Sequence, residues 1–179
     1  MLNSVESTLV LIDVQSSLAA VVDRSSEVVP KMLQAIQGCQ ALEVPVLPTL
    51  QVPEKLGPIH PEIESLLENE IQISKSSFSA LREPEFLLAL RQSEKTQVLL
   101  AGIETHVCVL QTGLDLLDAG YAVYVLADAV FSRTDENYRL GLQRLHNAGA
   151  VITSVEMALF ELLRTSKHPQ FRTISKLIK

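Results

Sequence analysis

Residues 97–117 read QVLLAGIETHVCVLQTGLDLL, and this stretch predicts a strand, a short turn and a helix in succession. The apolar run that ends at Gly102 is typical of a buried parallel strand, and apolar residues return with helical spacing after the turn. Cys108 falls at the start of the predicted helix, where free backbone N–H groups and the helix dipole lower the pKa of a thiol. Because a lone cysteine is often an inert apolar residue, the local pattern leaves both interpretations open.

The same alternation of short apolar runs and helical stretches continues along the whole chain. Strands are predicted at 8–12, 44–47, 71–74, 97–102, 123–127 and 151–153, and helices at 28–42, 62–68, 85–91, 109–119, 135–147, 157–163 and 170–178. Strands separated by helices predict an α/β fold, a three-layer doubly wound (Rossmann-like) sheet of about six parallel strands with helices on both faces. With no linker or repeat, residues 1–179 are expected to form a single domain.

Composition narrows the classes of partner. A net charge of −6 argues against nucleic acid and anionic membranes as partners, and no apolar run approaches the roughly 18–20 residues that span a bilayer. Two cysteines and no basic leader predict a cytoplasmic protein. Histidine and cysteine spacings typical of metal sites are missing, as are glycine-rich nucleotide motifs, so no metal and no cofactor are predicted. The expected partner is a small-molecule substrate.

Chemically complementary side chains follow three of the predicted strands. Asp13 ends the first strand, Lys75 ends the third, and Cys108 follows the fourth. Taken singly, Asp13 could be a turn or helix cap, and Lys75 could be a solvated surface charge. Because ligands bind beyond the carboxyl ends of strands in such sheets, we expect the carboxylate, the ammonium and the thiol to converge on one site. Cys39, inside an apolar helical stretch, is interpreted as a core residue.

Three motifs around these residues, 9–15 (LVLIDVQ), 75–79 (KSSFS) and 102–109 (GIETHVCV), resemble the isochorismatase-like cysteine hydrolase superfamily. The likeness is greatest to the isochorismatase domain-containing protein subgroup and covers nearly the whole chain. The resemblance implies a triad in which Cys108 is the nucleophile, Asp13 the general base and later acid, and Lys75 the cation between them.

The resemblance also implies a cis peptide bond between Ile103 and Glu104. That bond would turn the backbone N–H of Glu104 toward the pocket, beside the N–H of Cys108, to form an oxyanion hole. Gln15 and Phe78, which lie within the matching motifs, are predicted to bind the substrate.

Two departures from better-defined branches shape the functional prediction. Nicotinamidases carry zinc ligands near the second strand, whereas residues 48–53 (PTLQVP) offer none, and isochorismatases proper generally lack the nucleophilic cysteine. We therefore predict a metal-independent cysteine hydrolase that acts on a small carboxamide or related C–N bond through a thioester intermediate. The alternatives are a non-covalent hydrolase of vinyl ethers that uses Asp13 and Lys75, and a non-catalytic binding protein.

The C-terminal helical stretches at 157–163 and 170–178 carry apolar stripes. These stripes predict a homodimer or higher homo-oligomer. The alternative is that the stripes cover the edge of the chain's own sheet.

Overall fold

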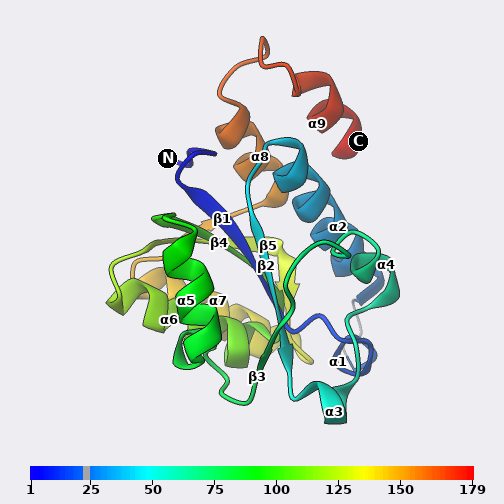
Figure 1. Cartoon of the computed structure of the whole chain (residues 1–179), viewed down its shortest axis with the longest axis vertical. Coiled ribbons are helices and arrows are strands. Elements are labelled where there is room, and N and C mark those ends of the chain that lie inside the picture. Colours follow the sequence, from blue (N-terminus) through cyan, green and yellow to red (C-terminus); the bar gives the residue numbers. More distant parts are fainter. Residues whose placement is uncertain (22–24) are drawn as a thin grey trace.

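The protein folds around one six-stranded parallel sheet, which a computed structural model describes for residues 1–21 and 25–179 (Figure 1). The strands are β1 (Ser7–Ile12), β2 (Val46–Gln51), β3 (Ile73–Lys75), β4 (Gln97–Ile103), β5 (Ala122–Phe131) and β6 (Val151–Thr153). Their order is β3-β2-β1-β4-β5-β6, and every neighbouring pair is parallel. This confirms the predicted doubly wound α/β fold, and it places the switch in strand order between β1 and β4.

Helices cover both faces of the sheet (Figure 1). On one face lie α2 (Ser25–Ala41), α4 (Pro61–Glu64), α8 (Val155–Leu163) and α9 (Phe171–Leu177), and on the other lie α5 (Pro84–Gln92), α6 (Leu110–Asp118) and α7 (Asp135–Asn147). Two short helices, α1 (Ser16–Ala19) and α3 (Pro53–Leu56), follow β1 and β2 and were not predicted. No helix among the described residues is long and apolar enough to cross a membrane.

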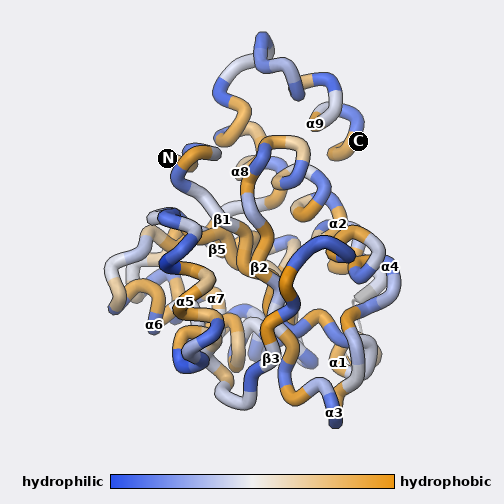
Figure 2. Tube along the Cα trace, in the orientation of Figure 1, coloured by the Kyte–Doolittle hydropathy of each residue, from blue (hydrophilic) through white to orange (hydrophobic). Residues whose placement is uncertain are grey.

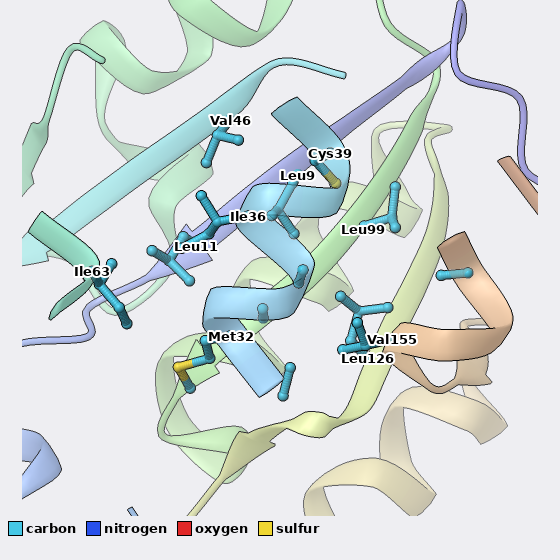
Figure 3. Packing of buried hydrophobic residues seen from close by; sticks show 14 of the residues in the cluster. Leu9, Leu11, Met32, Ile36, Cys39, Val46, Ile63, Leu99, Leu126 and Val155 are labelled. Carbon is cyan, nitrogen blue, oxygen red and sulfur yellow. The ribbon is translucent and has the colours of Figure 1, made fainter. Parts of the chain in front are cut away.

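Two hydrophobic clusters, one on each side of the sheet, form the core. Successive strand residues point to opposite faces, so Leu9 belongs to the cluster under α2 and Val10 to the cluster under α5 and α6. Figure 2 shows the apolar strands running through the interior. In Figure 3, Ile36 and Cys39 of α2 lie over the strands, and Cys39 is fully buried, as its core assignment predicted.

The apolar stripes near the C-terminus pack within the chain. Leu159 and Leu162 of α8 and Ile174 of α9 are buried in the same cluster as α2, which is the alternative foreseen for these helices. The opposite side of α8 keeps apolar side chains outside the core, with Met157 57% and Phe160 37% exposed.

Strand β2 extends further than its sequence indicated. The prediction ended it before Pro48, yet the strand continues to Gln51. Proline lacks a backbone donor and is tolerated where one side of a strand is unpaired. This condition holds here, because β2 pairs with β1 at Pro48 and with β3 only from Thr49 onward. The four extra residues bring Thr49 and Gln51 to the edge of the sheet where the site lies.

Close contact between β1 and β4 depends on a glycine. Gly102 pairs with Ile12 and has a φ of +121°, a conformation that side chains other than glycine rarely adopt. A Cβ at this position would overlap the carbonyl oxygen of Ile12. The glycine therefore lets the chain leading to Cys108 lie directly beside the strand that leads to Asp13.

Candidate active site

A buried ion pair joins the ends of β1 and β3. The Nζ atom of Lys75 lies 2.7 Å from Oδ2 of Asp13, and both side chains are 0% exposed. Asp13 has a φ of 50°, a left-handed conformation that occurs directly after the last residue of β1. Two charges removed from water in this way require mutual pairing and further hydrogen bonds.

Lys75 donates those further hydrogen bonds to three neutral oxygens. Its Nζ donates to Oε1 of Gln51 at 2.5 Å and to the backbone oxygens of Ser77 and Phe78, each at 3.1 Å. Gln51 stands opposite Lys75 in the β2–β3 register, so the two side chains project from the same face of adjacent strands. Together with Asp13, these oxygens surround the ammonium group with four acceptors.

Asp13 is held by Thr49 of β2. The Thr49 hydroxyl donates to Oδ1 of Asp13 at 2.8 Å, and the backbone N–H of Asp13 donates to the Thr49 carbonyl at 3.2 Å. One carboxylate oxygen therefore meets a hydroxyl donor and the other meets an ammonium. These two contacts fix the orientation of the carboxylate beside the ammonium group.

Cys108 completes the cluster from a π-helical turn, Thr105–Val109, that directly precedes α6. Both Asp13 and Lys75 lie close enough to its thiol to shift the pKa of that thiol. At 7% exposure, Cys108 is more accessible to solvent than Asp13, whose exposure is zero. Single π-helical turns are frequent at functional sites, and this one brings the sulfur next to the ion pair.

Burial raises the pKa of the Cys108 thiol to about 12, and the charge and hydrogen bond of Asp13 raise it as well. Lys75 acts in the opposite direction and lowers that pKa. The expectation that a helix start would leave Cys108 with a lowered pKa is therefore wrong, because desolvation outweighs the positive charges nearby. In the resting site the proton stays on sulfur, within reach of the Asp13 carboxylate.

The Ile103–Glu104 peptide bond is cis. The Glu104 carboxylate accepts hydrogen bonds from the backbone N–H and the Nε–H of Arg133, at 3.0 and 2.9 Å. The side chain of Glu104 therefore ties the turn that leads to Cys108 to the residues after β5. An oxyanion hole formed by the backbone N–H groups of Glu104 and Cys108 stays a prediction.

Gln15 and Phe78, the predicted substrate-binding residues, have different surroundings. Gln15 is fully buried, its Nε2 donates to the carbonyls of Gln51 at 3.1 Å and Gly57 at 2.7 Å, and its Oε1 accepts from the Gln51 N–H at 2.9 Å. Both of its donors are thus occupied in joining β1 to β2 and to the chain after α3, which argues against direct substrate binding. Phe78 is 52% exposed, and its role as a substrate contact stays a prediction.

Sequence reasoning overlooked Thr49 and Gln51, which lie beyond the point where β2 was expected to end. The available signal was the i, i+2 spacing of two polar residues after an apolar run, which places both on one face of a strand. Within residues 1–21 and 25–179, no group of three or more His, Cys, Asp or Glu side chains is arranged to hold a metal ion.

Known proteins resemble this chain in sequence and in overall fold. A family model described as the isochorismatase domain matches residues 7–157. A secreted isochorismatase effector from Phytophthora sojae is 42% identical over 97% of this chain and 84% of its own length. Isochorismatase domain-containing protein 2 from Xenopus laevis is 37% identical over 96% of this chain and 83% of its own length. A Caenorhabditis elegans structure titled MAR1 ribonuclease is 33% identical with a TM-score of 0.93, covering 99% of this chain and 91% of that one.

Proposed function

The chain belongs to the isochorismatase family of hydrolases, and on that premise we propose that it is a metal-independent cysteine hydrolase. Its substrate is a small carboxamide or a related compound with a scissile C–N bond, and the reaction passes through a thioester. The observation that carries this proposal is that Cys108 lies beside the buried Asp13–Lys75 ion pair. A base, a cation and a nucleophile in one cluster are the groups that acyl transfer needs.

In the proposed first half-reaction, Cys108 attacks the substrate carbonyl carbon while Asp13 accepts the thiol proton. The electron pair of the C=O bond moves to oxygen, and the backbone N–H groups of Glu104 and Cys108 stabilise the resulting oxyanion. As the C–N bond breaks, Asp13 returns its proton to the leaving nitrogen. The products of this half-reaction are an amine or ammonia and a Cys108 thioester.

In the second half-reaction, Asp13 takes a proton from water as the oxygen attacks the thioester carbonyl. Collapse of the second tetrahedral intermediate releases a carboxylic acid and restores the Cys108 thiol with the proton held by Asp13. Lys75 stays in contact with Asp13 and holds the carboxylate in place between proton transfers.

A substrate screen tests this function directly. Purified protein is incubated with amides, ureas and N-carbamoyl compounds, and product acids and amines are measured by mass spectrometry. For any substrate found, Cys108→Ala should lower kcat by about three orders of magnitude or more, as expected when a nucleophile is removed. Rapid acid quenching of the wild type should reveal the thioester as a mass increase on the Cys108 peptide. Full turnover by Cys108→Ala would refute the covalent mechanism.

A second candidate function is non-covalent hydrolysis of a vinyl ether by Asp13 and Lys75. Two observations favour it: the 42% identical relative is called an isochorismatase, and the Cys108 thiol is held protonated. In this case Asp13 would supply the acid–base chemistry and Cys108 would only shape the site. Cys108→Ala should then keep its activity on a vinyl ether such as isochorismate, whereas Asp13→Asn should lose it.

The nematode protein is called a ribonuclease, but the net charge of −6 on this chain opposes binding of a phosphate backbone. For the same reason we propose a small-molecule substrate. We further propose a cytoplasmic location, in which the two free cysteines stay reduced.

Self-association is also part of the proposal, through the outer side of α8, where Met157 and Phe160 are exposed. Light scattering coupled to size-exclusion chromatography should give a mass of at least two chains, each of 19.7 kDa. Met157→Glu should reduce that mass, and an unchanged oligomer would place the interface elsewhere.

A further inference from the structure

The turn after β3, residues Ser76–Phe78, holds the ammonium group of Lys75. Two of its carbonyl oxygens, those of Ser77 and Phe78, accept hydrogen bonds from Nζ at 3.1 Å each. Backbone carbonyls can hold an ammonium group in place only if the turn that carries them is itself held in place. The position of Lys75 therefore depends on what restrains this turn.

Two side chains from outside the turn restrain it. Oε1 of Glu83 accepts hydrogen bonds from the backbone N–H groups of Ser76 at 3.0 Å and Ser77 at 2.8 Å. Nε2 of Gln51 donates to the Ser76 carbonyl at 2.9 Å, while Oε1 of the same amide accepts directly from Lys75. Backbone donors and acceptors of the turn are thus both hydrogen-bonded. The two N–H donors are bonded to the charged carboxylate of Glu83.

Glu83 occupies a position where a side chain usually caps its own helix. It is the N-cap residue of α5, yet its side chain makes no capping hydrogen bond. The carboxylate instead reaches back six and seven residues to the turn. The hydrogen bond from the Ser77 N–H holds the pKa of Glu83 below its usual value, and the positive charge of Lys75 lowers it as well. The carboxylate is therefore ionised at neutral pH, when hydrogen bonds to it are strongest.

We propose that Glu83 is a positioning residue for Lys75, acting through the Ser76–Phe78 turn. The inference rests on the proposed function only in assigning Lys75 to the active site. Glu83 contacts the turn and not the reacting atoms, so its effect reaches Cys108 in two steps. The turn holds the ammonium, and the ammonium opposes the influence of Asp13 on the thiol.

The direction of the change in the Cys108 alkylation rate separates a positioning role of Glu83 from a direct effect of its charge. Removing the negative charge of Glu83 would by itself favour the Cys108 thiolate and speed its alkylation. Loosening the turn has the opposite effect, because a less firmly held Lys75 stabilises the thiolate less and neutralises Asp13 less. A positioning role thus predicts slower alkylation where charge removal alone predicts faster alkylation.

The experiment compares Glu83→Gln and Glu83→Ala with the wild type, using iodoacetamide as the probe. Alkylation of Cys108 is followed at pH 8–10 by peptide-resolved mass spectrometry, and circular dichroism confirms that each variant is folded. We expect the rate to fall about three- to tenfold in Glu83→Ala. The fall should be smaller in Glu83→Gln, whose amide oxygen can still accept one hydrogen bond.

Glu161→Gln is the matched control. Glu161 also accepts a hydrogen bond from a backbone N–H, that of Leu2 at 2.9 Å, but it lies on α8, on the opposite side of the molecule from β3 (Figure 1). Cys108 in Glu161→Gln should be alkylated at the wild-type rate. Wild-type or faster alkylation in both Glu83 variants would overturn the inference. If Glu83→Ala fails to fold, the rate of Glu83→Gln decides alone. Because iodoacetamide needs no substrate, this result is independent of whether Cys108→Ala loses turnover.

Discussion

Asp13→Asn should increase the reactivity of Cys108 toward iodoacetamide while it abolishes turnover. Asp13 raises the pKa of Cys108 by its charge and by its hydrogen bond, and Lys75 lowers that pKa. An asparagine removes the charge and leaves the lysine in place. Lys75→Met removes the opposite charge and should slow alkylation. Both variants lose catalysis, so the direction of the labelling change separates the two roles.

The magnitude follows from the thiolate fraction. With a pKa of about 12, only about one thiol in a thousand is ionised at pH 9, so alkylation of the wild type is slow and rises about tenfold per pH unit. A shift of about one pKa unit in either direction changes the rate about tenfold. We therefore expect Asp13→Asn to label about ten times faster than the wild type, and Lys75→Met about ten times slower.

Stability must be measured in parallel, because both substitutions break a fully buried pair. Removing one partner of such a pair costs about 3–5 kcal/mol, which would lower the Tm by roughly 6–20 °C in a domain of this size. Labelling is therefore followed at 15 °C on samples whose circular dichroism shows native structure. Equal or slower alkylation in folded Asp13→Asn would refute the assignment of Asp13 as the group that holds the proton on sulfur.

Three further predictions concern the supports of the site. Gly102→Ala should cost more than about 4 kcal/mol, or prevent folding, because its Cβ would overlap the Ile12 carbonyl, and thermal unfolding of the soluble fraction measures this. Thr49→Val should lower stability by about 1.5–3 kcal/mol, because Oδ1 of Asp13 loses its donor, and Thr49→Ser should restore most of the loss; equal stability of the two variants would contradict this. Because the pKa of Glu83 is lowered in the folded state, its contribution to stability is present above the unfolded value of 4.5 and is lost as pH falls through the folded value. Urea titrations from pH 6 to pH 3 should therefore show a smaller loss of stability in Glu83→Gln than in the wild type.

Much of the fold could be predicted because apolar periodicity reports burial directly. Strands β1 and β4 are covered on both faces and therefore contain continuous apolar runs. The three proposed catalytic residues were identified for the same reason, since each interrupts or follows an apolar strand. The end of β2 was missed because the effect of Pro48 depends on where β3 begins to pair, and this cannot be read from local sequence.

Roles that depend on hydrogen-bond partners were the least predictable. Gln15 was expected to bind the substrate, but its side-chain amide forms hydrogen bonds with backbone groups of Gln51 and Gly57. Glu83 gave no signal, since its partners lie in a turn whose shape the sequence does not reveal. The lowered pKa expected for Cys108 failed because local helix geometry is visible in sequence, whereas desolvation by distant segments is not.

The high pKa of Cys108 is compatible with nucleophilic catalysis because of charge balance in the buried cluster. With the proton on sulfur, the carboxylate of Asp13 and the ammonium of Lys75 cancel, and the cluster is neutral. Loss of the proton to solvent would leave a buried net charge of −1, which is costly, and this explains why the thiol resists titration. Transfer of the same proton to Asp13 instead leaves a thiolate beside an ammonium and a neutral carboxylic acid, so the net charge does not change. In the mechanism that we propose, Asp13 thus suppresses reaction with external reagents and provides the internal route by which the sulfur becomes a nucleophile. If Asp13 only neutralised Lys75, it would not also accept the thiol proton. Because Asp13 is proposed both to suppress alkylation and to accept that proton, Asp13→Asn should alkylate faster and lose turnover.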